Sequence, residues 1–286
     1  MLMWCSYCQR FEREVPPYDN FNITHGMCAA CRPTAFALAE SDIAHVRSLK
    51  EIQSQLAEAG RHGDFKAAEI IAEDAVKANI RPIDILLGIV APMLYQIGKD
   101  WEQSIITVAE EHRFTAFCEH VFESIVTKLR GAPPTDVTET DRAEVLLMSA
   151  EGNRHTLAIR ILALWLMNKG IRTQLVHPSP SLDDLMAVIS DTRPTALLVS
   201  MALPEHRATV LKTAERVAAL PGPIRPKIIV GGYAVKLGLV PEIPGAELVA
   251  DINTLDVAGK NIRHDNARPA LRVLSARGFK TSEGSD

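Results

Sequence analysis

The sequence predicts a doubly wound parallel α/β sheet, preceded by a helical bundle and a small cysteine-rich module. Three patterns predict this arrangement. Four of the five cysteines fall within the first 31 residues. Residues 41–130 carry apolar side chains at helical spacing, and short apolar strands alternate with helices further on. The expected divisions are a cysteine module at 1–33, a helical domain at 41–130, an α/β domain at 141–256 and a flexible tail at 257–286.

The composition is that of a folded globular protein. The chain has 286 residues, 47% of them hydrophobic and 23% charged, which is enough for one or two cores. Its net charge of -4 gives no general attraction to nucleic acid. No apolar run approaches the roughly 20 residues of a membrane helix, and the first residues lack the pattern of a signal peptide. We therefore expect a cytoplasmic protein that binds neither membranes nor, directly, nucleic acid.

Two Cys-x-x-Cys pairs stand in the amino-terminal module: Cys5, Cys8, Cys28 and Cys31. Four thiolates at such spacing suit tetrahedral zinc in a closed structural site, and cysteines in a reducing compartment favour metal binding over disulfides. A redox-active pair is the alternative. His25 is a possible substitute ligand, but with four cysteines present we expect it in a turn with Gly26. Cys118 lies on an apolar helix, where we expect a buried small side chain.

Residues 41–130 predict a bundle of four or five helices. The expected helices cover 65–78, 81–99 and 108–129, after a first one that contains the spaced apolar residues from Ile43 to Leu56. Asp64 is a suitable N-cap for the second. Pro82 suits the first turn of the third helix, and Pro92 predicts a kink inside it.

Beyond the linker-like residues 131–136 the pattern changes to buried strands. Strands are expected at 144–149, 173–176, 196–200 and 227–230, with helices at 157–168, 182–189 and 204–219. Each strand is a short apolar run, as in a parallel sheet covered on both faces. Ligands of such a sheet bind beyond the carboxyl ends of its strands. Three features stand there: Asn153-Arg154-His155, Ser200 and Gly231-Gly232.

The chemistry of these residues suits a metal-containing ligand. A neutral imidazole such as that of His155 is a good ligand for a first-row metal, and glycines let a backbone approach a ligand closely. Order and spacing resemble the cobalamin-binding fold, whose signature is Asp-x-His-x-x-Gly, then Ser-x-Leu, then Gly-Gly. The resemblance covers residues 141–255 and implies that His155 is the lower ligand of cobalt. It also implies a slot for the nucleotide tail, lined by Ser200, Gly231 and Gly232.

The sequence departs from this signature in three places. Asn153 replaces the aspartate, Ala158 replaces the glycine, and Ser200-Met201-Ala202 stands for Ser-x-Leu. An aspartate behind a metal-bound histidine raises its basicity, whereas Asn153 can accept the same hydrogen bond only without charge. Methyl-transfer and mutase members use that proton relay, so its loss argues against an enzyme. The Ala158 methyl crowds the tail, so another tetrapyrrole, a haem or a bilin, stays open. The alternative is an ordinary loop histidine on a flavodoxin-like sheet.

The helical half carries a second resemblance. Trp101, Glu111 and His112 form a Trp-x9-Glu-His pattern, which resembles the signature of photoreceptor cobalamin-binding domains. In those proteins a helical bundle caps adenosylcobalamin, and light breaks the cobalt–carbon bond. The resemblance covers roughly 45–130. It implies that Trp101 packs on the adenosyl group, that Glu111 contacts it and that His112 can become a second ligand. The alternative is that Trp101 is a core residue and that the Glu-Glu-His run that ends at His112 lies on the surface.

The two resemblances together imply a cobalamin-binding light sensor that is not an enzyme. A ligand change at cobalt would move the cap and alter a partner or oligomer interface. The sequence has no helix-turn-helix with a basic recognition helix. As in the antirepressor-like branch of the photoreceptor family, we therefore expect output through a protein partner, such as a transcription regulator or signalling protein, or through a homo-oligomer. A corrinoid methyl-transfer shuttle, a haem- or bilin-binding sensor and a ligand-free scaffold stay open as alternatives.

Overall fold

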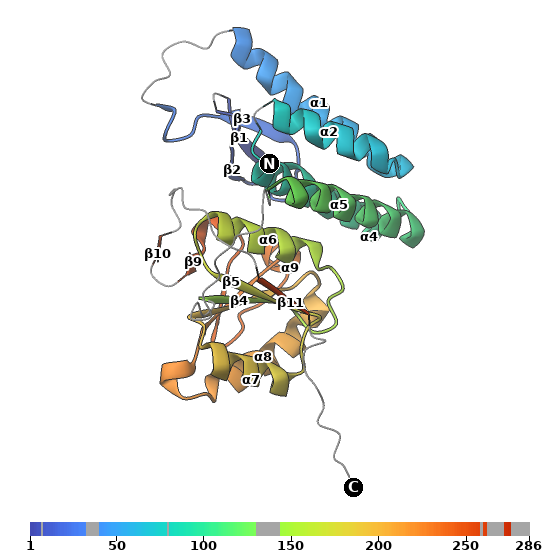
Figure 1. Ribbon diagram of the computed structural model, residues 1–286. Helices are drawn as coiled ribbons and strands as arrows, with labels where there is room; N and C mark the ends of the chain where they lie inside the picture. Colours follow the sequence, from blue (N-terminus) through green and yellow to red (C-terminus); the bar gives the residue numbers. More distant parts are fainter. Residues whose placement is uncertain are drawn as a thin grey trace. The chain divides into compact units, whose positions relative to one another are not determined.

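The structure is a computed structural model that describes residues 1–6, 8–32, 40–78, 80–129, 144–257, 260–261 and 272–275. The chain divides into two compact units, Met1–Pro133 and Pro134–Asp286 (Figure 1). The first holds a small sheet and a helical bundle, and the second holds the α/β sheet. The linker-like residues 131–136 and most of the expected tail lie outside the described residues.

A three-stranded sheet opens the first unit. Its strands are β1 (Leu2–Cys5), β2 (Phe11–Glu14) and β3 (Ile23–Gly26). β1 lies between the others, antiparallel to β2 and parallel to β3. The turn expected at His25 and Gly26 was wrong, because both residues belong to β3 and pair with Trp4 and Cys5 of β1. Nothing in the sequence predicted strands of four residues here, since runs this short show no clear alternation.

Four main helices form the bundle of this unit: α1 (Glu40–His62), α2 (Phe65–Lys77), α4 (Ala91–Glu102) and α5 (Val108–Leu129). α1, α2 and α5 pack on one another, and α4 packs on α5. Asp64 is the predicted N-cap of α2, and its carboxylate accepts a hydrogen bond from the Ala67 N–H at 2.9 Å. Cys118 is fully buried on α5, as predicted.

The kink expected at Pro92 takes the form of a π-helical turn. The short helix α3 (Pro82–Ile85) leads into the π-helical segment Leu86–Val90, which continues directly as α4. A proline ring inside an α-helix collides with the carbonyl four residues earlier, here that of Gly88. The wider turn changes the hydrogen bonding there, because the Ala91 N–H donates to the Leu86 carbonyl.

The second unit is the predicted parallel α/β sheet. Its strands are β4 (Val145–Ser149), β5 (Thr173–His177), β6 (Ala196–Ser200), β7 (Lys227–Gly231), β8 (Ala246–Leu248) and β11 (Arg272–Ser275). They lie in the order β11-β5-β4-β6-β7-β8, and every neighbouring pair is parallel. β11 differs from the expected flexible tail, since residues 272–275 add a strand to the sheet edge. β9 (Asp256–Val257) and β10 (Lys260–Asn261) form a separate antiparallel pair.

Helices cover both faces of this sheet. They are α6 (Leu157–Asn168), α7 (Leu182–Thr192), α8 (Arg207–Ala218) and the short α9 (Tyr233–Lys236). α6 lies on one face, and α7 and α8 lie on the other (Figure 1). The core under α7 and α8 contains apolar side chains of β4, β6 and β7. No helix in the described part of the chain is both long and apolar enough to cross a membrane.

Candidate functional site

The carboxyl ends of three neighbouring strands lie in register. Ser149 of β4 pairs with Ser200 of β6, and Ser200 pairs with Gly231 of β7. β4 and β6 flank the switch point of the sheet, because the chain passes from β4 to β5 on one side and returns to β6 on the other. Ligands of doubly wound sheets bind at this point. The Ser149 hydroxyl is buried there with no hydrogen-bond partner among the described residues.

Asn153 ties the loop after β4 to the end of β6. Its side-chain N–H donates to the Ser200 carbonyl at 3.1 Å, and its amide oxygen accepts from the backbone N–H of His155 at 3.0 Å. Only 6% of the residue is exposed. Asn153 therefore binds the backbone of His155 and not its imidazole, which differs from the hydrogen bond considered from the sequence. A carboxylate could not copy this arrangement, because it has no N–H to offer the Ser200 carbonyl.

His155 lies in the loop between β4 and α6, and the residue is exposed. The hydrogen bond from its backbone N–H to Asn153 fixes the main chain but leaves the ring open to a ligand. The side chain thus stands at the switch point of the sheet, as the sequence predicted. An exposed imidazole in such a place can bind a metal that approaches from solvent.

The Gly231-Gly232 pair has an explanation within the chain. Gly232 has φ = 107°, and a Cβ there would lie 2.5 Å from the Met201 carbonyl oxygen and 2.8 Å from the Met201 nitrogen. The Met201 N–H also donates to the Gly231 carbonyl at 2.8 Å. The glycines therefore let β7 and the loop after β6 approach each other. This close packing accounts for Gly232 without a ligand, so the pair alone does not indicate a tail slot.

A second histidine stands at the switch point. His206 follows β6 in a 3₁₀ turn, Pro204–His206, and its Nδ1 is buried without a partner in the described part of the chain. Burial lowers the pKa of His206, and the nearby His155 lowers it further, while Glu205 raises it. His206 was not among the residues predicted from the sequence. Its position in the loop after the third strand was the available signal, since such loops line the ligand side of the sheet.

The second candidate group lies at the turn between α4 and α5. Trp101 occupies the last turn of α4, which ends where Ser104 adopts φ = 57° and the Ser104 N–H donates to the Trp101 carbonyl at 2.9 Å. Trp101 is 41% exposed, Ile105 65% and Val108 50%. The Trp is thus not a core residue. Three large apolar side chains exposed within one turn mark a surface that can cover a flat ligand.

Glu111 and His112 follow at the start of α5. The helix begins with a capping box, in which the Glu110 carboxylate accepts from the Thr107 N–H at 2.8 Å. Glu111 is buried, and its carboxylate accepts from the Thr115 hydroxyl at 2.8 Å. The His112 side chain is exposed, and its Nε2 lies 3.5 Å from the Glu111 carboxylate. The structure therefore gives Glu111 a fixed position and leaves His112 accessible.

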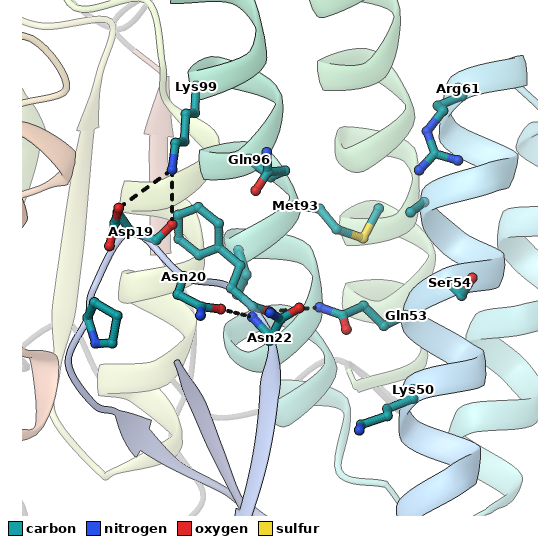
Figure 2. Close-up of a pocket in the computed structure, with 14 residues that line it drawn as sticks. Asp19, Asn20, Asn22, Lys50, Gln53, Ser54, Arg61, Met93, Gln96 and Lys99 are labelled. Carbon is teal, nitrogen blue, oxygen red and sulfur yellow. Dashed lines mark hydrogen bonds and ion pairs between the residues drawn. The ribbon is translucent and has the colours of Figure 1, made fainter.

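The first unit also contains a cleft of about 660 Å³. Three elements enclose it: α1, α4 and the loop that precedes β3 (Figure 2). Its lining includes the basic residues Lys50, Arg61 and Lys99 and the buried apolar residues Phe21 and Met93. The sequence did not predict this cleft, because its walls come from segments distant in the chain.

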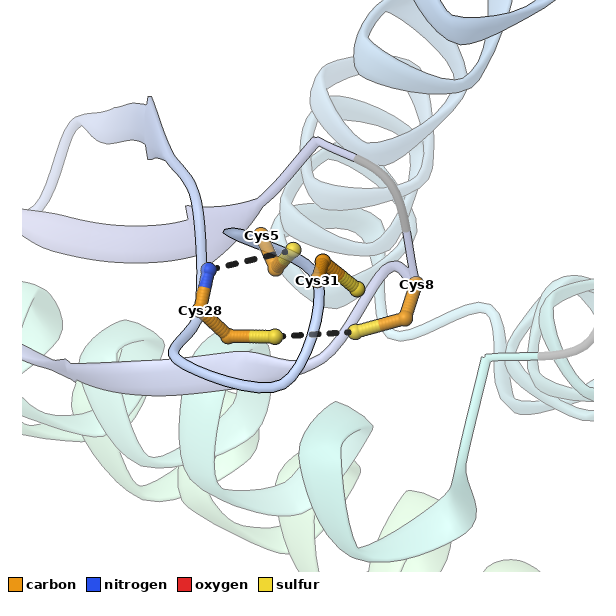
Figure 3. Close-up of side chains that lie close together, drawn as sticks. All are labelled: Cys5, Cys8, Cys28 and Cys31. Carbon is orange, nitrogen blue, oxygen red and sulfur yellow. Dashed lines mark hydrogen bonds between the residues drawn. The ribbon is translucent and has the colours of Figure 1, made fainter. Parts of the chain in front are cut away.

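The four predicted metal ligands come together at one end of the small sheet (Figure 3). The Sγ atoms of Cys5, Cys8, Cys28 and Cys31 all lie within 4.8 Å of one another. The Cys8 and Cys28 sulfurs are 3.7 Å apart. Tetrahedral zinc with Zn–S bonds of about 2.3 Å requires sulfurs about 3.8 Å apart. The Cys28 N–H also donates to the Cys5 sulfur at 3.4 Å, as expected for a sulfur that carries negative charge in a metal site. This arrangement can hold a metal ion.

Without a metal, two of these thiols have raised pKa values. Burial raises the pKa of Cys31 to about 11, and the hydrogen bond with Cys28 adds to this rise, while the one with Cys8 opposes it. Burial also raises the pKa of Cys8, and hydrogen bonds with Cys5 and Cys28 add to that rise. His25 is not one of the group, although both its ring nitrogens are buried with no hydrogen-bond partner among the described residues. Burial lowers the pKa of His25, and the charge of Lys50 lowers it further.

Comparison with known proteins gives matches to both units. Residues 52–125 match the family described as B12 binding domain, and this span includes Trp101, Glu111 and His112. The HTH-type transcriptional repressor CarH of Myxococcus xanthus is 27% identical to the chain over 142 residues. That match covers 50% of this chain and 44% of the repressor, so the chain spans less than half of that relative's length.

The solved structure of the monomethylamine corrinoid protein from Methanosarcina barkeri has a similar fold. Its TM-score is 0.59 at 14% identity, and the similarity covers 70% of this chain and 92% of that one. The likeness confirms the predicted combination of a helical region and a parallel sheet. Together, the matches support the resemblance to cobalamin-binding proteins.

Proposed function

We propose that this chain binds cobalamin and acts as a light-responsive regulator. The match of residues 52–125 to the B12 binding domain carries the proposal. Trp101, Glu111 and His112 all fall within that span, and the Trp is exposed at a helix end. The similarity to a transcriptional repressor supports a regulatory role over an enzymatic one.

In this proposal the sheet unit would supply the ligand of cobalt. His155 is exposed at the switch point, where its imidazole can ligate cobalt. Two orphaned polar atoms stand at the same edge, the Ser149 hydroxyl and the Nδ1 of His206. Buried polar atoms without partners are costly, so they fit a site completed by polar groups of a ligand such as the nucleotide tail. Asn153 is engaged with the backbone, which leaves His155 without a carboxylate behind it.

The bundle residues would contact the adenosyl group. Trp101, together with Ile105 and Val108, offers a flat apolar surface to an adenosyl group. Glu111 is held by Thr115, so its carboxylate can accept a hydrogen bond at a fixed position. Adenosylcobalamin, when bound, supplies a cobalt–carbon bond that light can break. The role of the protein is to bind the cofactor and to present a changed surface to a protein partner.

The decisive experiment compares absorption spectra in the dark and after illumination. The full chain is loaded with adenosylcobalamin in the dark, freed of unbound cofactor and then illuminated. We expect bound cobalamin and a spectral change that persists on the protein. His155→Ala should lose the imidazole-ligated spectrum, whereas His177→Ala, an exposed histidine at the end of β5, should keep it.

The bundle residues are tested in the same assay. Trp101→Ala should weaken dark binding of adenosylcobalamin more than that of hydroxocobalamin, because only the former carries the adenosyl group. Ile70→Ala on α2, another exposed apolar residue, is the matched control and should bind both alike. A chain that retains no cobalamin contradicts the binding proposal. Binding without any response to light contradicts the sensor proposal alone.

A corrinoid carrier for methyl transfer is the second candidate. The similarity in fold to a corrinoid protein favours it. The hydrogen bonds of Asn153 argue against it, because both bind backbone groups and no proton relay reaches the His155 imidazole through this residue. Protein-bound methylcobalamin that passes its methyl group to a thiol at a catalytic rate, given a partner methyltransferase, would favour the carrier. We expect no such transfer.

A further inference from the structure

The cleft of the first unit has the size and the preformed walls of a small-molecule site. Its volume of about 660 Å³ falls within the range of roughly 300–1,000 Å³ of such sites. Hydrogen bonds hold the loop wall in place, because the Gln53 amide donates to the Phe21 carbonyl at 3.3 Å and the Asn22 N–H to the Asn20 side chain at 2.9 Å (Figure 2). The cleft therefore exists without a ligand to shape it.

The charge of the lining is positive. Three basic side chains face one carboxylate, that of Asp19. Asp19 is already engaged, since Lys99 lies 3.6 Å from its carboxylate and donates to its carbonyl at 3.3 Å. Arg61 forms an ion pair with the exposed Glu58, which also lies near His62. Lys50 has no carboxylate partner in the described part of the chain and additionally faces the imidazole of His25. A negatively charged ligand would supply the ion-pair partner that Lys50 lacks.

The positions of two cations give the occupant a shape. Lys50 and Arg61 are eleven residues apart on α1, about three helical turns, so they share one face and stand about 16 Å apart along it. On α1 the lining between them consists of Gln53, Ser54 and Ala57, and the buried side chains of Phe21 and Met93 also line the cleft. The lining thus carries a cation at each end of this α1 face and a mixture of polar and apolar side chains elsewhere.

We propose that this cleft binds an elongated organic anion with an acidic group at each end. None of the lining residues is among those assigned to cobalamin, so the inference stands whether or not the proposed function holds. Both ends contribute through partly exposed ion pairs, each of which strengthens binding by only about two- to fivefold. Contacts between the body of the ligand and the preformed walls supply the rest.

The test compares two probes that differ in one acidic group. Nonanedioate carries a carboxylate at each end, and nonanoate has the same length with only one. Each is titrated into the full ¹⁵N-labelled chain, and the side-chain amide signals of Gln53 and Gln96 report on the cleft. We expect saturable shifts at both amides and affinity at least threefold higher for nonanedioate.

Charge reversal assigns the ends. Lys50→Glu and Arg61→Glu should each reduce the affinity for nonanedioate to that for nonanoate or below. Lys66→Glu, an exposed lysine on α2 outside the cleft, is the matched control and should bind like the parent chain. Lys50→Gln and Arg61→Gln remove the charge without reversing it, and we expect smaller losses of affinity for nonanedioate in the same order. These variants keep the test valid if a charge reversal disturbs folding.

Three outcomes overturn the proposal. Equal affinity for the two probes removes the role of the second acidic group. Binding that neither reversal changes removes the role of the cations. Shifts confined to the Trp101 indole, with none at Gln53 or Gln96, place the probes on the exposed apolar turn instead of in the cleft.

Discussion

At the scale of single residues, Asn153 shows why an amide stands where the cobalamin signature has an aspartate. The side chain gives an N–H to the Ser200 carbonyl and takes one from the His155 backbone. Asn153→Asp would place a buried carboxylate against a carbonyl oxygen, with loss of one hydrogen bond. We expect destabilisation of the second unit by about 1–3 kcal/mol at neutral pH, measured by urea unfolding.

The pH dependence of this variant follows from the same contact. A protonated carboxyl can donate to the Ser200 carbonyl, so the folded state raises the pKa of the new group. The loss of stability is therefore absent at low pH and grows as pH rises from about 4, the ordinary pKa of aspartate. Asn168→Asp, an exposed residue at the end of α6, is the control and should change stability by a few tenths of a kcal/mol. A pH-independent loss would rule out this explanation.

Gly232 is a second residue whose role is set by contacts within the chain. Gly232→Ala would combine a positive φ of 107° with a Cβ at 2.5 Å from the Met201 carbonyl oxygen. Gly238→Ala is the matched control, because its φ is also positive, at 69°, with nothing within 4 Å of the new Cβ. The control should cost about 1 kcal/mol and Gly232→Ala at least 2 kcal/mol more, in urea unfolding. Equal losses would mean that the loop after β6 moves aside.

The residues at the sheet edge could be predicted only in part. His155 follows from an apolar strand and the loop after it, so the sequence alone places it at the switch point. The engagement of Asn153 with Ser200 is a contact between residues 47 positions apart, and no local pattern encodes it. His206 was missed because only its position after the third strand marks it, and a histidine after Pro204 has no periodicity to distinguish it.

At the scale of elements, the small sheet and the bundle meet at the π-helical turn. A Cβ on Gly88 would lie 2.3 Å from Cζ2 of Trp4 and 2.9 Å from Cδ2 of Phe11. Asp84 supports the same contact, because its buried carboxylate binds Arg81 at 2.6 and 2.7 Å and accepts the Phe11 N–H. The helix that carries Trp101 is thus braced by the cysteine module.

Two glycines of this helical segment provide the test. Gly88→Ala should destabilise the first unit by about 2–4 kcal/mol, because it displaces the fully buried Trp4. Gly98→Ala lies in α4 with nothing within 4 Å of the new Cβ, and should stabilise by about 0.5–1 kcal/mol. Urea unfolding followed by the near-UV signal of the tryptophans measures both. Similar effects of the two substitutions would contradict the brace.

The success of prediction differed between kinds of element. α5 and α6 begin and end at the predicted residues, because apolar periodicity acts locally, and α5 has a capping box as well. The π-helical turn was not predicted, since it depends on the close approach of Trp4 and Phe11 as well as on Pro92. The strands of the small sheet are too short for a pattern, and the cysteines around them obey ligand geometry instead of alternation.

At the scale of the whole molecule, we expect zinc in the cysteine module and two units that respond differently to its removal. Inductively coupled plasma mass spectrometry of the purified chain should find one zinc per chain. Cys28→Ser should abolish it, and Cys118→Ser, a buried cysteine outside the cluster, should keep it. Chelation should lower the thermal midpoint of the first unit by roughly 8 °C or more, for a loss of about 2 kcal/mol, and leave the second unit unchanged.

The response of this metal site to pH distinguishes zinc binding from a merely structural cysteine cluster. In the metal-free chain the raised pKa values mean that the Cys8 and Cys31 thiols are protonated at neutral pH, so zinc must displace their protons and its affinity rises with pH. Burial raises the pKa of Cys31 from 9.0 to about 11. The metal-free first unit is therefore expected to lose stability as pH rises between these values, since the unfolded chain gives up its proton first.

Zinc-bound thiolates have no proton to lose, so the zinc-loaded first unit should show no such decline in stability. Parallel decline with and without zinc, followed by circular dichroism across this pH range, would exclude thiolate ligation by the cluster.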